Sequence, residues 1–330
     1  MQTACTWMKS LLKKDPQAAW QEIFAFLWEK FSSPILVHDP IAEVVRRERS
    51  IEAIELLLSH ACWDLWSAYD TSVPHASAEI LSFWDRHPQG KAVLLLDGLS
   101  LREVPWILAG VQKHGYHVHA ARVCGAELPP DTTSFANALH LSQRSILQNN
   151  GAGSAHKLHG ATTECTEVPW RECIEMVGAS PYIFFWHGWP DFRLHDLSSP
   201  GQGLEKITRE AKESLGSEDF WQWIHRLTTG RRLLITSDHG YAASGFFPDT
   251  TGEAEVTHLK KWFKSGRFSP GDAPQGEWVP PIELQLTTSQ GPCHFVLGRR
   301  KWKSAGGYPT LTHGGLSLME VAIPFIELSR

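Results

Sequence analysis

The spacing of apolar residues divides the chain into a helical first part and an alternating second part. Within residues 17–31 the apolar side chains repeat with the period of a helix, at Trp20, Ile23, Phe24 and Leu27. Residues 41–62 and 76–86 show the same spacing. We therefore expect residues 1–88 to form an N-terminal helical region.

Continuous apolar runs mark the strands of the second part. The first extends from Lys91 to Asp97 between two glycines, as expected of a strand that is buried on both faces. Further strands are expected at 116–123, 182–186, 232–236, 293–298 and 320–328, and helices at 101–113, 133–148 and 203–228. Because strands and helices alternate, residues 89–330 predict an α/β domain, a mostly parallel sheet sandwiched by helices.

Residues 244–290 interrupt this alternation. They are rich in proline, glycine and threonine, and they lie between two predicted strands of the α/β domain. We expect them to form an insertion or a cap on that domain.

Composition excludes several classes of protein. With 330 residues, 42% of them hydrophobic, the chain can bury a sizeable core, which excludes a disordered chain and a disulfide miniprotein. The net charge of −5 means that any polyanion would need a local basic patch. The six cysteines form no CxxC pair, and residues 1–14 lack the apolar core of a signal peptide. No run approaches the length of a membrane-spanning helix, so we expect a cytoplasmic protein with reduced thiols and no membrane association.

Carboxylates and imidazoles stand at the ends of several predicted strands, where open α/β sheets form their sites. They are Asp97, His187, Asp191, His195, Asp238, His239 and, before the last strand, His313. Each alone can be a helix cap, a turn residue or half of a surface pair, but their joint occurrence favours a site. Oxygen and nitrogen ligands without sulfur suit two ions of zinc, with manganese as the alternative. His187 can also support a ligand or contact a phosphate.

A two-metal site of this kind needs a nucleophile. Hydroxyl candidates lie at a predicted helix start, within residues 131–134, where a metal would lower the pKa of a hydroxyl. The same four residues, Asp131, Thr132, Thr133 and Ser134, are also ordinary helix N-caps.

Five segments resemble the PglZ family of the alkaline phosphatase superfamily. They read VLLLDGLSLREVP (93–105), LPPDTTSFANAL (128–139), FWHGWPDFRLH (185–195), LLITSDHGY (233–241) and YPTLTHGGLSLMEVAIPFIEL (308–328). The resemblance covers residues 90–330 and implies an alkaline-phosphatase-like fold. It also implies that Thr132 is the nucleophile.

The same resemblance implies two metal-ligand sets and a phosphate contact. One ion would be held by Asp97, Thr132, Asp238 and His239, and the other by Asp191, His195 and His313. The family's arginine follows the first aspartate by about three residues, whereas Arg102 here follows Asp97 by five. Arg102 is the candidate for contact with the phosphate.

The family implies metal-dependent phosphodiester hydrolysis of nucleotides or nucleic acid, in bacterial phage-defence systems such as BREX. A basic run beside His313, formed by Arg299, Arg300 and Lys301, can hold a nucleic-acid backbone or be a solvated turn. Because family members are usually longer, a protein partner is expected to dock on the N-terminal helical region. Two alternatives stay open, a phosphomonoesterase of the same superfamily and an interaction module of a defence complex with little or no turnover.

Overall fold

A computed structural model describes residues 2–86, 89–196, 203–245, 249–272, 278–303 and 310–330 of the chain. Parts of three sequence expectations lie outside the described residues. These are 87–88 at the predicted domain boundary, 246–248 and 273–277 of the predicted insertion, and 308–309 of the last family-like segment.

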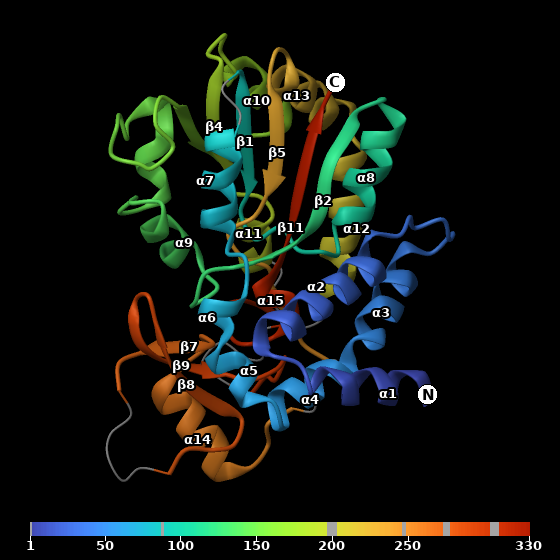
Figure 1. The fold of residues 1–330 in the computed structure, drawn as a ribbon, viewed down its shortest axis with the longest axis vertical. Helices are drawn as coiled ribbons and strands as arrows, with labels where there is room; N and C mark the ends of the chain where they lie inside the picture. The colour runs from blue at the N-terminus through green and yellow to red at the C-terminus, as the bar shows by residue number, and fades with distance from the viewer. Residues whose placement is uncertain (1, 87–88, 197–202, 246–248, 273–277, 304–309) are drawn as a thin grey trace.

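A six-stranded sheet forms the centre of the molecule, in the order β2-β11-β5-β1-β4-β3 (Figure 1). Its strands are β1 (Lys91–Leu96), β2 (His117–Gly125), β3 (Thr162–Thr166), β4 (Tyr182–His187), β5 (Arg232–Thr236) and β11 (Ala322–Ser329). β1 runs parallel to β4 and β5, and β3 runs parallel to β4. β11 runs antiparallel to both β5 and β2. The predicted mostly parallel sheet is confirmed.

Helices cover both faces of this sheet. Along β1, Leu94 and Leu96 pack into one apolar cluster and Val93 and Leu95 into another, because successive side chains of a strand point to opposite faces. The first cluster includes α8 (Val104–Lys113), α10 (Trp170–Met176), α12 (Gly203–Gly216) and α13 (Glu218–Thr228). The second includes α7 (Ala76–Arg86), α9 (Thr132–Ala138) and the 3-10 helix η1 (Arg144–Asn150).

The helix predicted at 133–148 is wrong in its second half. α9 ends at Ala138, and His140 has a φ of 63°, a left-handed conformation that does not continue a helix. Because the chain turns there, Arg144 starts a separate 3-10 helix rather than extending α9.

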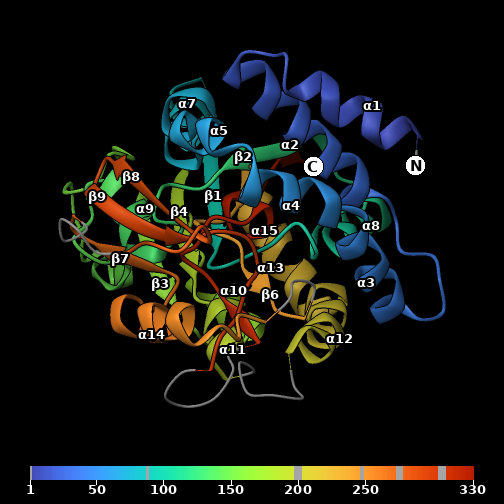
Figure 2. The same cartoon turned by 90° about the horizontal axis from the view of Figure 1, so that it is seen from below.

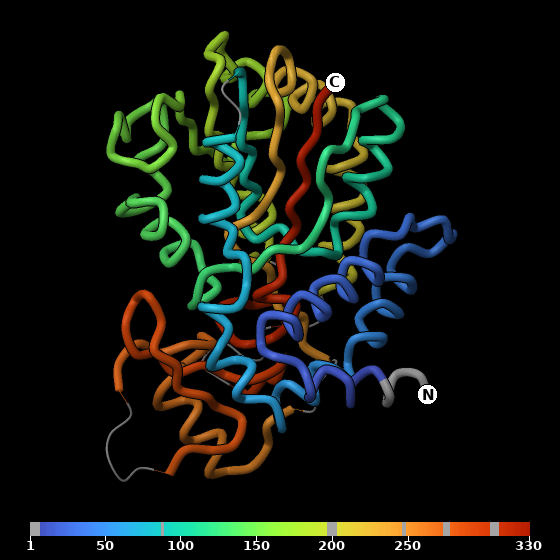
Figure 3. Tube along the Cα trace, in the orientation of Figure 1, coloured from blue at the N-terminus to red at the C-terminus, as the bar shows by residue number. Residues whose placement is uncertain are grey.

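Residues 2–72 form short helices beside the sheet (Figure 1), and their path can be followed along the chain trace in Figure 3. They are α1 (Gln2–Leu11), α2 (Pro16–Ser32), α3 (Pro40–Ser50), α4 (Glu52–His60), α5 (Trp63–Ser67) and α6 (Tyr69–Ser72). The predicted helix 41–62 is therefore two helices, which meet at Ile51. Trp20 and Leu27 of α2 belong to the same buried cluster as Leu94 of β1. No helix in the described part of the chain is both long and apolar enough to cross a membrane.

A small sheet with one helix lies below the central sheet in Figure 1. It consists of β7 (Phe268–Pro270), β8 (Glu283–Thr288) and β9 (Gly291–Val296), with α14 (Glu253–Trp262). The strand predicted at 293–298 is thus not part of the main alternation. β9 pairs with β7 and β8, because a two-residue turn folds it back on β8 as a hairpin. This unit therefore extends past residue 290.

A buried cluster of four charges ties these parts together. The four residues are each at most 2% exposed, and they are Glu48 of α3, Glu55 of α4, Arg102 before α8 and Arg299 after β9. Arg299 forms ion pairs with both Glu48 and Glu55, and Arg102 pairs with Glu48. Glu55 also accepts a hydrogen bond from the backbone N–H of Leu318, at 3.0 Å. The N-terminal helices, the central domain and the small sheet therefore meet in one polar core.

Removal of one charge from this cluster is expected to destabilise the protein strongly. Arg299→Met leaves Glu48 and Glu55 buried with fewer partners, so we expect the free energy of unfolding to fall by about 3–5 kcal/mol. Urea denaturation followed by tryptophan fluorescence measures this loss. The control is Arg209→Gln, which breaks an exposed pair with Glu205 and should lower that free energy by less than about 1 kcal/mol. Equal losses in the two variants would contradict the proposed role of the cluster.

Candidate metal centre

The carboxyl edge of the central sheet gathers aspartates and histidines from distant parts of the chain. Asp97 follows β1 directly, Asp238 and His239 follow β5, and Asp191 begins α11 (Asp191–Asp196) just after β4. His313 follows the short strand β10 (Leu311–Thr312), which lies outside the central sheet, and it precedes β11. Because β11 is antiparallel to β5, its amino end lies at the same edge as the carboxyl ends of the parallel strands. Figure 2 views this edge of the molecule from below.

Asp97 is fully buried, and both of its carboxylate oxygens are engaged. Oδ2 accepts hydrogen bonds from the Trp186 indole at 2.9 Å and from the Arg144 guanidinium at 2.7 Å. Oδ1 faces the Thr132 hydroxyl at 3.3 Å. Donors on Oδ2 therefore fix the orientation of the carboxylate and leave Oδ1 toward the site.

Arg144 is a site residue that the sequence analysis missed. Its second guanidinium nitrogen donates to Glu167 at 2.6 Å, so it bridges that carboxylate and Asp97. Arg144 lies in a segment predicted as the interior of a helix, and it follows no strand. No local signal marks it, because its role depends on partners brought close by the fold.

Asp97, Asp238 and His239 form one group whose ligand atoms lie within 4.8 Å of one another. The Nδ1–H of His239 donates to the Gly240 carbonyl at 2.9 Å, so its Nε2 faces the two carboxylates, each at 3.6 Å. Asp238 accepts the backbone N–H of Gly98 at 3.0 Å. Gly98 has a φ of +72°, a backbone conformation that favours glycine.

Asp191, His239 and His313 form a second such group, so the two groups share His239. His313 Nε2 lies 3.5 Å from Asp191 Oδ1, and its ring stacks on that of His239 with centroids 4.1 Å apart. His195 lies outside both groups, but its Nε2 is 3.3 Å from Asp191 Oδ2. The structure therefore brings together all seven residues predicted as ligands, although His239 is common to both groups rather than to one.

The turn that presents His313 is held by a buried ion pair. Glu320 lies five residues after Gly315, just before β11. It accepts hydrogen bonds from the Gly315 backbone N–H at 2.8 Å and from Arg267 Nε at 2.7 Å. A Cβ atom added at Gly315 would lie 2.7 Å from Arg267 Nε. The absence of a side chain at Gly315 thus allows the backbone to approach this pair closely, and at Gly314 it allows close approach to the Phe268 ring.

Charge crowding shifts the pKa values of the site. Burial alone would lower the pKa of His239, but the three neighbouring aspartates, Asp238 foremost, raise it to about 9. Burial and the charges of Asp238 and Asp191 raise the pKa of Asp97 well above its usual range. Burial and the nearby charge of His239 lower the pKa of His313 to about 3. Burial opposes ionisation of Asp191, yet the surrounding histidines hold its pKa below the usual range.

The residues of the site fit divalent cations. Asp191 Oδ1 is buried and has no hydrogen-bond partner among the described residues, although a carboxylate oxygen in that position needs a positive charge. Three aspartates converge there on two histidines, without any sulfur ligand. Oxygen and imidazole donors of this kind suit zinc or manganese.

Among the hydroxyls at the start of α9, only Thr132 enters this group. Its Oγ1 donates to Asp238 Oδ2 at 3.0 Å and lies 3.5 Å from His239 Nε2. Asp131 caps the helix by accepting the Ser134 backbone N–H at 2.8 Å, and Thr133 is exposed. The cap and the candidate nucleophile are therefore different residues.

Three of the residues predicted to bind substrate are corrected by the structure. Arg102 and Arg299 are buried in the ion cluster with Glu48, so their guanidinium groups do not face the metal centre. His187 donates from Nε2 to the Val168 carbonyl at 2.8 Å and accepts the Trp189 N–H on Nδ1 at 3.0 Å. Burial lowers the pKa of His187 to about 4. Both ring nitrogens are occupied within the protein, so neither is available to a substrate.

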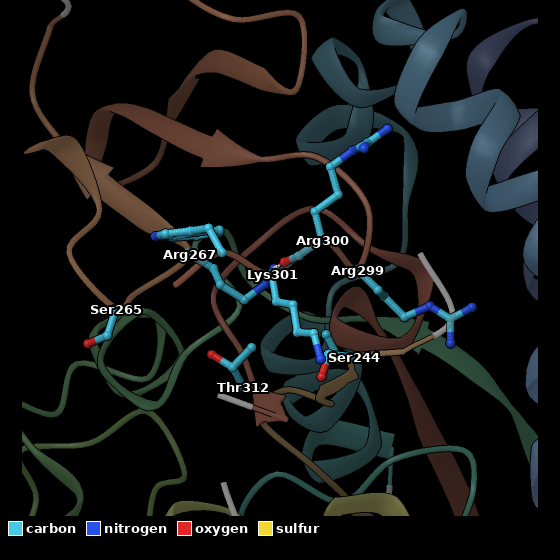
Figure 4. A pocket seen from close by; sticks show the side chains of 9 residues that line it. Ser244, Ser265, Arg267, Arg299, Arg300, Lys301 and Thr312 are labelled. Carbon is cyan, nitrogen blue, oxygen red and sulfur yellow. Dashed lines mark hydrogen bonds between the residues drawn. The ribbon is translucent and has the colours of Figure 1, made fainter. Parts of the chain in front are cut away.

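The other two basic residues lie at a small pocket beside the strand pair β6 (Ala242–Ala243) and β10 (Leu311–Thr312). Figure 4 shows the Lys301 side chain directed toward Ser244 and Thr312, whereas Arg300 points away from them. Arg300 contacts His60 at 2.8 Å, and Lys301 lies 3.8 Å from Asp249. Lys301 therefore lies beside β10, the strand that leads directly into His313.

No model of a known protein family matches the chain, and no curated protein does. Solved structures show a likeness over 72% of the chain. Murine ectonucleotide pyrophosphatase/phosphodiesterase 5, as an inactive variant with AMP, is 12% identical over 87% of its length with a TM-score of 0.43. The human protein of the same name is 10% identical over 87% of its length, with a TM-score of 0.43. Phosphonoacetate hydrolase from Sinorhizobium meliloti 1021, in complex with phosphonoformate, is 13% identical over 89% of its length, with a TM-score of 0.42. A likeness of this size assigns neither a family nor an activity.

Metal binding at this site is expected to strengthen as the pH rises from 6 to 9. In the metal-free protein a pKa of about 9 keeps His239 protonated at neutral pH, and the raised pKa of Asp97 makes that carboxyl hold its proton to a higher pH than usual. A cation must displace these protons, so the dissociation constant should fall by about tenfold per pH unit for each proton released. Calorimetric titration with zinc, in buffers of different ionisation enthalpy, measures both the affinity and the protons released. An affinity that does not change with pH would contradict this account.

Proposed function

We propose that the chain is a two-metal phosphoester hydrolase that acts through the hydroxyl of Thr132. The observation that carries the proposal is the position of Thr132 Oγ1, which hydrogen-bonds to the carboxylates of Asp97 and Asp238. A threonine that served only to start a helix would not need contact with two fully buried aspartates.

Two divalent cations held by this site would stabilise charge on the phosphoryl oxygens and favour ionisation of the Thr132 hydroxyl. Thr132 Oγ1 forms a bond to phosphorus while the bond to the leaving alcohol oxygen breaks. The hydroxyl proton passes to the hydrogen-bonded carboxylate of Asp238, 3.0 Å away, and the leaving oxygen takes up a proton. Water then hydrolyses the threonine phosphoester and restores the hydroxyl. The Arg144 guanidinium, bound to Asp97, contributes positive charge at the same edge.

The substrate that we propose is a phosphodiester of a nucleotide or nucleic acid, and the setting is cytoplasmic anti-phage defence. Both parts rest on the five segments that resemble the PglZ family. Support comes from the meeting of the Asp, Thr and His residues of those segments in one place, at the carboxyl edge of the sheet. Zinc is the proposed metal, with manganese as the alternative.

A protein partner on the N-terminal helical region is part of the same proposal. Large apolar side chains remain exposed there, with 90% exposure at Leu36, 58% at Leu12 and 53% at Val37. Apolar exposure at adjacent residues, as at Leu36 and Val37, is typical of surfaces that bind other proteins. This region is also fixed to the central domain through Glu48, so a partner bound there would be held in a fixed position relative to the site.

Hydrolysis of bis-p-nitrophenyl phosphate with added zinc or manganese tests the chemistry. We expect Thr132→Ala to lower kcat by about 1,000-fold or more, because the attacking group is lost. The matched control is Thr133→Ala, which removes an exposed hydroxyl one residue away and should leave kcat unchanged. A chelator should abolish turnover by both the wild type and the control.

Other outcomes would contradict this proposal in distinct ways. Equal rates for the wild type and Thr132→Ala would move the nucleophile to Thr133 or to a bound water. Faster cleavage of p-nitrophenyl phosphate than of the diester would indicate a phosphomonoesterase. Absence of all turnover would favour an interaction module.

A further inference from the structure

A cavity of about 540 Å³ adjoins the metal centre on the side of β3 and β4. Its walls come from the carboxyl ends of these strands and from α10, α11, α12 and α13, which Figure 2 shows gathered on one side of the sheet. The lining residues on which the argument depends are Trp170, Phe192, Glu213, Ser214 and Asp219.

One wall of this cavity is aromatic and rigidly supported. The Trp170 and Trp189 rings meet edge to face with centroids 5.6 Å apart, and Trp170 stacks on Trp223 at 5.3 Å. The indole N–H of Trp170 donates to the Ser214 hydroxyl at 2.7 Å, which fixes the plane of its ring. Phe192 extends the same wall. Fixed aromatic rings suit a flat ring of a ligand, because stacking then requires no rearrangement of the protein.

The rim of the cavity carries hydrogen-bond acceptors and excess negative charge. Glu167 and Glu210 are paired with Arg144 and Arg193, whereas Glu213 and Asp219 form no ion pair with any described residue. Because Glu213 and Asp219 are exposed, solvent screens their charge. Their carboxylates therefore act chiefly as acceptors for N–H donors of a ligand, and they disfavour a further phosphate in the cavity.

Three features link residues of the cavity to residues of the metal centre. The Arg144 guanidinium spans Asp97 and Glu167 with hydrogen bonds of 2.7 and 2.6 Å. The backbone N–H of Asp97 donates to the carbonyl of His187, a cavity residue, at 2.9 Å. Phe192 directly follows Asp191 in α11. The rim of the cavity, at Glu167, is therefore linked to Asp97 of the metal centre through the two hydrogen bonds of one guanidinium group.

We propose that this cavity binds the nucleobase of the substrate, stacked on Trp170 and Phe192, with its N–H groups donating to Glu213 and Asp219. Guanine fits best, because its adjacent N1–H and amino donors match the two oxygens of a carboxylate. The inference rests on the proposed phosphodiesterase function, and it names the substrate class of that same site. A nucleoside monophosphate ester fits better than a chain with further phosphates, since the rim repels them.

Four p-nitrophenyl phosphodiesters that share one leaving group test the proposal. Their other substituents are guanosine, thymidine, choline and methyl. For the wild type with zinc, we expect the guanosine ester to have a KM about tenfold lower than the methyl ester, with thymidine between them. The double variant Glu213→Gln and Asp219→Asn should raise the KM for the guanosine ester by about tenfold and leave the methyl ester unchanged.

The matched control is Glu218→Gln, which removes an exposed carboxylate beside Asp219 that does not line the cavity. It should leave every KM unchanged. Phe192→Ala is a second, independent variant. It should raise the KM for the guanosine and thymidine esters alike, because it removes part of the aromatic surface on which a base would stack. A guanosine preference that survives both cavity variants would overturn the proposal.

The experiment distinguishes failure of the cavity proposal from failure of the proposed hydrolase function. Equal KM values for the guanosine and methyl esters, with turnover intact, would overturn the cavity proposal alone. Preference for the choline ester would also overturn it, by showing a site for an organic cation. If no ester is cleaved, the proposed function fails, and calorimetry with guanosine monophosphate tests the cavity directly. No binding, or binding equal in the double variant, then overturns the cavity proposal too.

Discussion

Repulsion among three buried aspartates is the constraint on which this molecule depends. Asp97, Asp191 and Asp238 lie at one edge of the sheet, where water does not screen their charges. Arg144 and a protonated His239 offset part of this repulsion, while burial and the charges of Asp238 and Asp191 still raise the pKa of Asp97. Asp191 also has a buried carboxylate oxygen that accepts no hydrogen bond from the described residues. These features have one common explanation if cations complete the site.

The central sheet creates this crowding through the directions of its strands. The parallel strands β1, β4 and β5 deliver aspartates at their carboxyl ends, and the antiparallel β11 brings His313 to the same edge from its amino end. The turn that carries His313 is then held by Arg267 and Glu320. The small sheet that contributes Arg267 is thus a support for the metal centre as well as a neighbour of it.

Arginines in this protein serve two different purposes. Arg102 and Arg299 neutralise Glu48 and Glu55 in the interior, where they join the N-terminal helices to the rest of the chain. Arg144 instead lies between Asp97 and Glu167, where it is within reach of both the metal centre and the adjoining cavity. In the function that we propose, the cavity with its aromatic residues would hold the organic part of a phosphoester.

The sequence alone determined the α/β class and most residues of the candidate metal centre, because both depend on local signals. An unbroken apolar run such as that of β1 indicates a strand buried on both faces, and a charged residue at its end indicates the edge of the sheet. The tertiary structure alone decided which basic residues are available. Arg299 pairs with a glutamate 251 positions away, and Arg144 meets Asp97 across 47 positions. It also decided that His239 is shared and that β9 belongs to the small sheet. Pairing across such separations follows from the packing of the whole chain, which no local pattern encodes.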